Sequence, residues 1–322
     1  MSGVTATSHP DQQSLPGTGV PARGRSSFAV VTVSYFSGDH LRAFVASLGR
    51  ATTAAPLVVI ADNAESDDVP AAVADEFERV HVVRTGANIG YGGAVNRAVA
   101  ELGRLARTSD GPDAEPVDFV VVANPDVVWG EGSLDALLAA ADRWPRAGSL
   151  GPLIREPDGT VYPSARRVPD LVSGTGHALL GAVWKSNPWT ASYRQDDQSI
   201  SERSVGWLSG SCLVLRRSAF ESVNGFDSRY FMYMEDVDLG DRLATAGWLN
   251  VYVPDAEIVH DKGHSAGKHP ELMLPAHHRS AYRFQADRHP HAWQAPLRWA
   301  LRAGLAMRSR LAVRAARRDD HS

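Results

Sequence analysis

The chain has 322 residues, of which 43% are hydrophobic and 22% charged, and its formal net charge is -4. These values are typical of a globular protein of one large or two small domains, and they exclude a wholly disordered, collagen-like or fibrous chain. The single cysteine, Cys212, excludes a disulfide framework and a metal site built from several cysteines. Residues 298–318 carry seven arginines and no acid, whereas the rest of the chain is acidic. This charge distribution is not that of a nucleic-acid-binding protein.

The two ends of the chain differ in composition from its body. Residues 1–27 are rich in Ser, Thr, Gly and Pro, and we expect them to form a disordered tail. No apolar run reaches the roughly 20 residues of a membrane-spanning helix. The N-terminus also lacks the basic and apolar regions of a secretory signal, so we expect a cytoplasmic protein.

From residue 28 onward, strand and helix patterns alternate. Apolar runs of strand length cover residues 28–34, 57–61, 80–83 and 118–123, and helical patterns cover 39–50, 70–78, 90–107 and 133–143. Ser133 is the expected N-cap of the last of these helices. Continuous apolar strands that alternate with helices predict an α/β fold with one Rossmann-like, mostly parallel sheet and helices on both faces.

The alternation weakens after residue 150. Strand-like pieces recur at residues 205–208, 212–216 and 250–253, and a helix is expected over 235–246 with Gly247 just past its end. From residue 277 the pattern is helical again, which predicts a C-terminal helical extension. Cys212 lies inside an apolar run and is interpreted as a core residue.

Polar residues follow three of the predicted strands, at Ser34-Tyr35, Asp62-Asn63 and Asn124-Pro125-Asp126. Ligands of open α/β sheets bind at the carboxyl ends of the strands, although each group alone also suits an ordinary turn. A glycine-rich segment, residues 86–96, lies between a strand and a helix, where a ligand can approach the backbone closely. It matches neither the P-loop nor the dinucleotide-binding fingerprint.

Acidic and histidine side chains supply candidates for catalysis and metal binding. Asp126 has the oxygen ligands that Mg²⁺ or Mn²⁺ prefers, and His260, which follows a strand-like segment, is a candidate to complete a metal site. Asp236 directly follows the aromatic stretch 230–234. Apolar neighbours raise the pKa of a carboxylate, which suits a general base, although acids at a helix start are also favoured electrostatically.

Taken in order, these motifs resemble the inverting glycosyltransferases of family 2, which have the GT-A fold, and more narrowly the bacterial rhamnosyltransferases. The resemblance covers roughly residues 28–318. It implies inverting transfer of L-rhamnose from dTDP-β-L-rhamnose to the GlcNAc of a polyprenyl-diphosphate-GlcNAc, with an α-1,3 linkage, in cell-wall linker assembly. The motifs that carry it are Ser34-Tyr35, Asp62-Asn63, Asn88-x-Gly90-x-Gly92-x-x-x-Asn96, Asn124-Pro125-Asp126, Trp207-x-Ser209-Gly210, Gly225-Phe226-Asp227, Phe231-x-Tyr233-x-Glu235-Asp236-x-Asp238 and His260.

The resemblance also implies a role for each matched residue. Asp236 is the implied base, with Glu235 beside it, and Asp126 and His260 are the implied ligands of Mg²⁺ or Mn²⁺. Asn124 replaces the first acid of the family's D-x-D motif, so fewer charges hold the cation. The implied acceptor-binding residues are Trp207, Ser209 and Gly210. The implied nucleotide-binding residues are Ser34, Tyr35, Asp62, Asn63, Asn88, Gly90, Asn96 and Asn124.

On the same grounds, residues 28–270 are expected to form the catalytic domain, with a nucleotide-sugar half at 28–130 and an acceptor half at 150–265. Helices at 271–318, whose arginines lie mostly opposite an apolar stripe, are expected to associate with the inner face of the cell membrane, and 319–322 form a tail. A family 2 enzyme with another donor or acceptor is an alternative. A nucleotidylyltransferase is disfavoured because no basic residue follows the first strand, and an inactive sugar-nucleotide-binding protein because Asp126 and Asp236 are both present.

Overall fold

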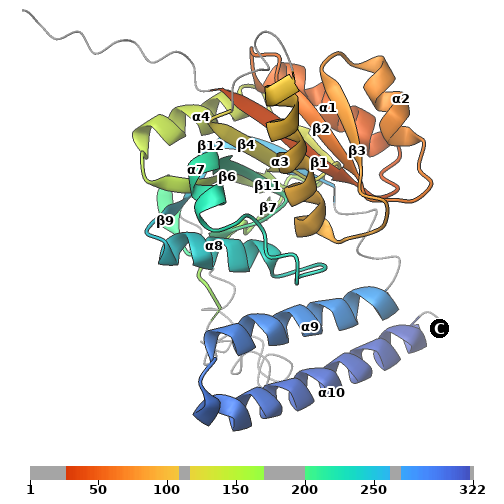
Figure 1. Cartoon of the computed structure of the whole chain (residues 1–322), viewed down its shortest axis with the longest axis vertical. Helices are drawn as coiled ribbons and strands as arrows, with labels where there is room; N and C mark the ends of the chain where they lie inside the picture. The colour runs from red at the N-terminus through yellow and green to blue at the C-terminus, as the bar shows by residue number, and fades with distance from the viewer. Residues whose placement is uncertain (1–26, 109–116, 170–199, 262–269, 320–322) are drawn as a thin grey trace, which may run out of the picture.

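The computed structural model describes residues 27–108, 117–169, 200–261 and 270–319 (Figure 1). A mixed sheet runs through the centre in the order β3-β2-β1-β4-β11-β6-β12-β5, with β7 beside β6 and β9 beside β12. A second, two-stranded sheet pairs β8 (Ala165–Arg166) with β10 (Trp207–Leu208). The strands of the main sheet are β1 (Phe28–Ser34), β2 (Leu57–Asp62), β3 (Val80–Arg84), β4 (Phe119–Ala123), β5 (Val127–Trp129), β6 (Ala147–Arg155), β7 (Val161–Tyr162), β9 (Arg203–Val205), β11 (Cys212–Arg216) and β12 (Leu249–His260).

The sheet is mostly parallel, which confirms the predicted α/β class. β1 pairs in parallel with β2 and β4, β2 with β3, and β6 with β12, whereas β11 and β5 run antiparallel to their neighbours in the sheet. In the register, Ser34 lies opposite Asp62, and Asp62 lies opposite Arg84. The polar residues that end β1, β2 and β4 therefore share one edge of the sheet.

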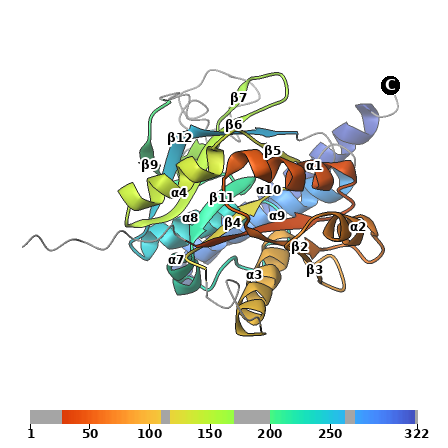
Figure 2. The same cartoon turned by 90° about the horizontal axis from the view of Figure 1, so that it is seen from above.

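Helices cover both faces of the sheet because successive strand residues point to opposite sides. Val58 and Ile60 pack toward α1 (Asp39–Ala51), α2 (Val69–Glu76) and α4 (Ser133–Arg143). Val59 and Ala61 pack toward α3 (Tyr91–Thr108), α7 (Arg217–Ser222) and α8 (Glu235–Thr245). Figure 2 shows α1 and α4 on one side of the strands and α3 on the other. The two cores are thus separated by a sheet whose central strands β1, β2 and β4 are buried on both faces.

The structure corrects the predictions for Ser133 and for residues 205–208. Gly132, not Ser133, is the N-cap of α4, and the Ser133 hydroxyl instead donates to the carbonyl of Gly130 at 2.8 Å. The expected strand over residues 205–208 is divided at Gly206 between β9 and β10, which belong to different sheets. A Cβ at Gly206 would lie 2.6 Å from the backbone nitrogen of Val168, so this close crossing of two chain segments requires glycine.

Other expectations of the second half are refined or met. β6 has no counterpart in the predicted pattern, and the two short segments expected near residues 250–259 form one strand, β12, with a register shift between Val253 and Glu257. Cys212 is buried in β11, as predicted. Gly247 lies just past α8 with φ +88°, also as predicted. The helix expected over 90–107 is α3, which ends at Thr108, and residues 109–116 lie outside the described ranges.

The C-terminal part forms two helices, α9 (Pro270–Arg288) and α10 (Ala295–Asp319), joined through a short 3₁₀ turn, Ala292–Gln294. α9 lies next to α8, and α10 lies alongside α9 on its outer side (Figure 1). Phe284 of α9 packs with Tyr230 and Val237, which fixes α9 to the body. Within the described ranges, no helix is both long and apolar enough to cross a bilayer.

Candidate active site

The carboxylates of Glu235 and Asp236 begin α8, where the main sheet, the two-stranded sheet and α9 meet. Tyr233 and Met234 directly precede them with φ of 66° and 67°, a left-handed conformation that is costly for residues other than glycine. Both oxygens of Asp236 accept backbone hydrogen bonds, Oδ2 from the nitrogen of Gly210 at 2.9 Å and Oδ1 from that of Val237 at 2.8 Å. The carboxylate is therefore held in one orientation.

The packing around Asp236 leaves little freedom for its position. A Cβ at Gly210 would lie 3.2 Å from the Cβ of Asp236. A Cβ at Gly240 would lie 2.7 Å from the Cβ of Trp207, so α8 and β10 pack closely. The hydroxyl of Tyr91, at the start of α3, donates to the carbonyl of Gly210 at 2.8 Å. Tyr91 and Trp207 thus support the two segments, around Gly210 and in α8, that hold the carboxylate.

The electrostatics of the acidic pair favour proton uptake. Burial, and then the charge of Asp236, raise the pKa of Glu235 from 4.5 to about 8. Glu235 Oε2 is buried and accepts no hydrogen bond from the described residues. Burial also raises the pKa of Asp236, although its backbone hydrogen bonds and the charge of Arg166 oppose that shift. Because the two carboxylates are adjacent and buried, ionisation of one disfavours ionisation of the other, so the pair holds a proton to a higher pH than a free carboxylate does.

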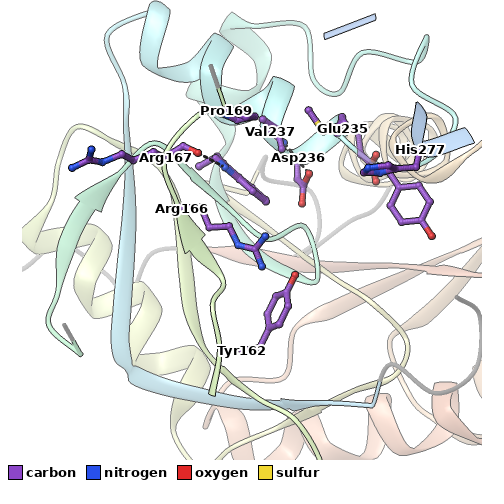
Figure 3. Close-up of a pocket in the computed structure, with 11 residues that line it drawn as sticks. Tyr162, Arg166, Arg167, Pro169, Glu235, Asp236, Val237 and His277 are labelled. Carbon is purple, nitrogen blue, oxygen red and sulfur yellow. Dashed lines mark hydrogen bonds between the residues drawn. The ribbon is translucent and has the colours of Figure 1, made fainter. Parts of the chain in front are cut away.

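A cavity of about 250 Å³ opens in front of the acidic pair. Figure 3 shows Arg166 directed into this cavity, between Asp236 and Tyr162, whereas Arg167 points away. Trp207 completes this side and donates its indole N–H to the carbonyl of Arg167 at 2.8 Å. The cavity is lined by Tyr162, Arg166, Arg167, Pro169, Trp207, Tyr233, Met234, Glu235, Asp236, Val237 and His277.

The carboxyl ends of β1 and β2 form a second polar surface. Ser34 and Asp62 are buried, at 0% and 2% exposure, while Tyr35 is half exposed. Asp62 Oδ1 accepts from the backbone nitrogen of Ala64 at 3.2 Å, and its Oδ2 lies 3.9 Å from Nε of Arg84. Asp62 thus remains a rigid acceptor at the sheet edge, next to an exposed aromatic ring.

Two asparagines shape the glycine-rich segment. Asn63 donates to Oδ1 of Asn88 at 2.9 Å and accepts from the nitrogen of Ile89 at 3.0 Å. Oδ1 of Asn88 also accepts from the nitrogen of Gly90 at 3.1 Å. Gly90 has φ +80°, and a Cβ there would lie 2.4 Å from the carbonyl oxygen of Phe231, which also accepts from the nitrogen of Tyr91. The segment is therefore locked against the chain that leads to the acidic pair.

A third group of polar atoms converges where β12 pairs with β5. Nε2 of His260 lies 3.1 Å from Oδ1 of Asp126 and 3.3 Å from Nδ2 of Asn124. Among the described residues, Oδ1 of Asp126 is buried and lacks a hydrogen-bond partner. Two adjacent ligands of an octahedral Mg²⁺, each about 2.1 Å from the ion, lie about 3 Å apart. The pair therefore fits a divalent cation, although no cluster of three or more His, Cys, Asp or Glu forms within the described ranges.

Comparison with known proteins places this architecture in a family. Residues 25–282 match the model of the glycosyltransferase-like family 2. The chain belongs to this family. It is 59% identical over 289 residues, 90% of this chain and 94% of the relative, to the N-acetylglucosaminyl-diphospho-decaprenol L-rhamnosyltransferase of Mycobacterium tuberculosis. It is 30% identical over 203 residues, 63% of this chain and 72% of the relative, to the rhamnosyltransferase WbbL of Escherichia coli.

Solved structures support the fold of this family 2 glycosyltransferase. GalNAc-T7, crystallised with UDP, GalNAc and Mn²⁺, matches with a TM-score of 0.53 and 17% identity, over 80% of this chain and 48% of that one. The mannosyltransferase PcManGT from Pyrobaculum calidifontis, in complex with GDP-Man and Mn²⁺, matches with a TM-score of 0.54 and 15% identity, over 91% of this chain and 74% of that one. The predicted GT-A fold is thereby confirmed.

Two predicted site residues of the glycosyltransferase, Asn96 and Ser209, form hydrogen bonds with neighbouring segments of the chain. Both polar ends of the Asn96 amide bind the backbone of Phe226, at 2.7 and 3.0 Å, and so join α3 to the loop after α7. The hydroxyl of Ser209 lies 3.0 Å from that of Ser211, and its backbone nitrogen donates to the carbonyl of Ser164. Asn96 and Ser209 therefore support neighbouring site segments through these bonds.

The sequence interpretation missed several residues that the fold brings to the site. Tyr162, Arg166 and His277 line the cavity, and Tyr91 supports Gly210. Arg166 lies in a short strand within a segment of weak periodicity, so no pattern indicated its direction. The only available signal was the residue type, because arginine suits bidentate contact with anions.

Proposed function

We propose that this protein transfers L-rhamnose from dTDP-L-rhamnose to the GlcNAc of a polyprenyl-diphosphate-linked acceptor, with inversion at the anomeric carbon. The name of the 59% identical relative supports the sugar and the acceptor. The single observation that carries the chemistry is the placement of Asp236, whose two oxygens are held by backbone N–H groups at the wall of a cavity. A fixed carboxylate with a raised pKa suits a general base.

In this proposal, a hydroxyl of the acceptor sugar lies in the cavity beside Asp236. Asp236 accepts the hydroxyl proton as the oxygen bonds to the anomeric carbon of the donor. The bond from that carbon to the diphosphate oxygen breaks on the opposite face, and the nucleoside diphosphate leaves with the electron pair. The ring carries positive charge in the transition state, as in inverting glycosidases. One displacement converts a β-linked donor into an α-linked product, and we expect the α-1,3 linkage.

Donor binding is assigned to the opposite edge of the site. Ser34, Tyr35 and Asp62 line the proposed nucleoside pocket, with Asp62 accepting from the pyrimidine. Asn63 and Asn88 hold the glycine-rich segment in shape, so that the backbone at Gly90 can approach the sugar phosphate. Because Gly90 also contacts Phe231, donor binding and the position of the acidic pair are linked through a short stretch of chain.

Asp126 and His260 are the proposed holders of a divalent cation, Mg²⁺ or Mn²⁺, next to Asn124. When bound, such a cation supplies positive charge for the departing diphosphate. Asn124 contributes a neutral side chain where a second acid is expected in the family. The chain therefore brings one negative charge to the pair, so we expect the nucleotide to complete the site.

α10 is the proposed contact with the membrane that contains the lipid acceptor, on the cytoplasmic face. Its side toward α9 includes the partly buried Leu301 and Leu305, whereas Trp299 and Met307 are 78% and 63% exposed. Exposed tryptophan, an apolar residue and several arginines on one helix suit the interface of an anionic bilayer. Of the apolar stripe expected from the sequence on this helix, Leu301 and Leu305 are partly buried, whereas Leu297 and Leu311 are exposed.

The test is transfer by the purified full chain, supplied with a panel of nucleotide sugars and a synthetic GlcNAc-diphosphate lipid. The product is identified by mass and by its anomeric configuration. We expect a deoxyhexose adduct only with dTDP-L-rhamnose and an α linkage. Transfer of a different sugar would overturn the donor assignment, and hydrolysis of the nucleotide sugar without transfer would overturn the assignment as a transferase.

A further inference from the structure

The cavity in front of Asp236 contains the positively charged side chain of Arg166, to which neither the family nor the sequence motifs assign a role. Arg166, in β8, extends into the cavity (Figure 3). Its Nε donates to the carbonyl of Pro163 at 2.7 Å, and its guanidinium lies 5.3 Å from the ring centre of Tyr162 and 5.6 Å from that of Trp207. Stacking on two rings and one backbone bond hold the side chain in place.

The contacts of this guanidinium leave its outer edge available. Among the described residues, Arg166 bonds to a backbone carbonyl and lies against two aromatic rings, and no carboxylate forms an ion pair with it. A guanidinium has five N–H donors, and the bond to Pro163 uses one of them. The remaining donors suit bidentate contact with a phosphate or carboxylate. Arg167, its neighbour, points away from the cavity and provides an internal comparison (Figure 3).

The position of Arg166 indicates which substrate it meets. The cavity is lined by residues of β7, β8, β10, α8 and α9 and of the loops next to β8 and α8, and it includes none of the proposed donor or cation residues, such as Asp62, Asn88 or Asp126. Arg166 is also close enough to Asp236 for its charge to act on that carboxylate. In the proposed function, the side of the site that contains Asp236 and Trp207 binds the acceptor, so an anionic group that reaches Arg166 there comes from the acceptor.

We propose that Arg166 binds the diphosphate of the lipid-linked acceptor, while the sugar lies between Trp207 and Asp236. This inference rests on the proposed function, because the diphosphate-linked acceptor comes from it. The acceptor sugar is joined to its diphosphate through one oxygen, so base and guanidinium on the same cavity wall contact neighbouring parts of one molecule. Arg166 thereby selects a phosphorylated sugar over a neutral glycoside and places its hydroxyl beside the base.

The test compares Arg166→Gln with the matched control Arg167→Gln in the full chain. Binding of two acceptor analogues, a GlcNAc-diphosphate-alkyl lipid and a GlcNAc alkyl glycoside, is measured by calorimetry, and binding of dTDP in parallel. A lost hydrogen bond to a charged group corresponds to roughly a 10- to 100-fold weaker affinity. We expect this loss in Arg166→Gln for the diphosphate analogue alone, with unchanged glycoside and dTDP binding, and no loss in Arg167→Gln.

The remaining outcomes separate this inference from the proposed function. Equal losses for both analogues in Arg166→Gln would overturn the inference, because they would indicate a damaged cavity. An unchanged affinity of Arg166→Gln for the diphosphate analogue would also overturn the inference. Loss of dTDP affinity in Arg166→Gln would assign the guanidinium to the donor and also overturn it. If the parent binds the diphosphate analogue through Arg166 but transfers no sugar to it, the proposed reaction fails while the anion subsite stands.

Discussion

Oδ1 of Asp126 lies 3.1 Å from Nε2 of His260, because the antiparallel pairing of β5 with β12 sets His260 opposite Val127. The two side chains are therefore brought together by strand register. A buried carboxylate oxygen that forms no hydrogen bond among the described residues is a costly arrangement, and a bound cation would relieve it.

Replacing Asp126 or His260 should remove the dependence of nucleotide binding on a divalent cation. We expect Mn²⁺ to strengthen dTDP binding to the parent. In the presence of Mn²⁺, Asp126→Ala and His260→Ala should each bind dTDP at least about 10-fold more weakly than the parent does. Calorimetric titration of dTDP with and without Mn²⁺ measures it, and Asp39→Ala, at an exposed site on α1, is the control. Full activity of the parent in EDTA would show that the cation model is wrong.

Replacing the proposed base should remove chemistry and spare binding. Asp236→Asn retains a side chain of similar shape but cannot accept the acceptor proton, so we expect a loss of roughly 10²–10⁴ in transfer rate. Affinity for dTDP should stay within a few fold. The control is Asp241→Asn on the same helix, where the carboxylate pairs with Arg288. A rate for Asp236→Asn close to that of the parent would refute the assignment.

The raised pKa of Glu235 predicts a pH dependence of stability. The folded protein holds this proton more tightly than the unfolded chain does, since the pKa rises from 4.5 to about 8 on folding. The stabilisation by protonated Glu235 is complete below about pH 4.5 and is lost as the pH rises toward 8. Glu235→Gln does not ionise, so its Tm advantage over the parent should grow from pH 5 to 8 and then level off.

Thermal unfolding of the parent and Glu235→Gln across this pH range measures the effect. Glu221→Gln is the control, because the side chain of Glu221 is 57% exposed and pairs with Arg217. Its Tm difference from the parent should show no comparable rise. A constant difference for Glu235→Gln would mean that Glu235 ionises normally in the folded protein.

Alanine substitutions at two glycines of the glycine-rich segment can distinguish the effect of backbone strain from the effect of a lost close contact. Gly86 and Gly90 have φ of +82° and +80°, so alanine at either position should cost roughly 1–2 kcal/mol of backbone strain. A Cβ at Gly86 meets nothing within 4 Å, whereas one at Gly90 meets the carbonyl oxygen of Phe231. We expect Gly90→Ala to lower the Tm further than Gly86→Ala and to weaken dTDP binding. Equal effects of the two substitutions would exclude a role for the contact with Phe231.

The exposed side of α10 should govern vesicle binding. We expect Trp299→Ser combined with Met307→Ser to reduce co-sedimentation with vesicles that contain anionic lipid several-fold, because interfacial binding depends on buried apolar area. Binding of the parent should fall as salt rises. Ile200→Ser, which removes an apolar side chain that is 62% exposed on the body, is the control. Equal binding by the double variant, or no response to salt, would contradict the proposed membrane contact.

Much of the fold followed from the sequence alone, because local pattern carries strong information in buried parallel strands. The continuous apolar runs at β1, β2 and β4 and the helices between them were predicted nearly to the residue. β6 was missed because its small residues and proline lack a clear strand pattern. The polar groups after β1, β2 and β4 were placed at one edge by a general property of parallel sheets.

The relations between distant segments were decided only by the tertiary structure. Asp236 was a candidate from its aromatic neighbours, but its orientation depends on the nitrogen of Gly210 in another segment. The direction of Arg166 depends on Tyr162 and Trp207, which share no sequence pattern with it. The exposed face of α10 depends on which side α9 covers. Sequence determines which groups are available and how each segment folds, whereas packing between segments determines which groups meet, since those contacts have no local periodicity.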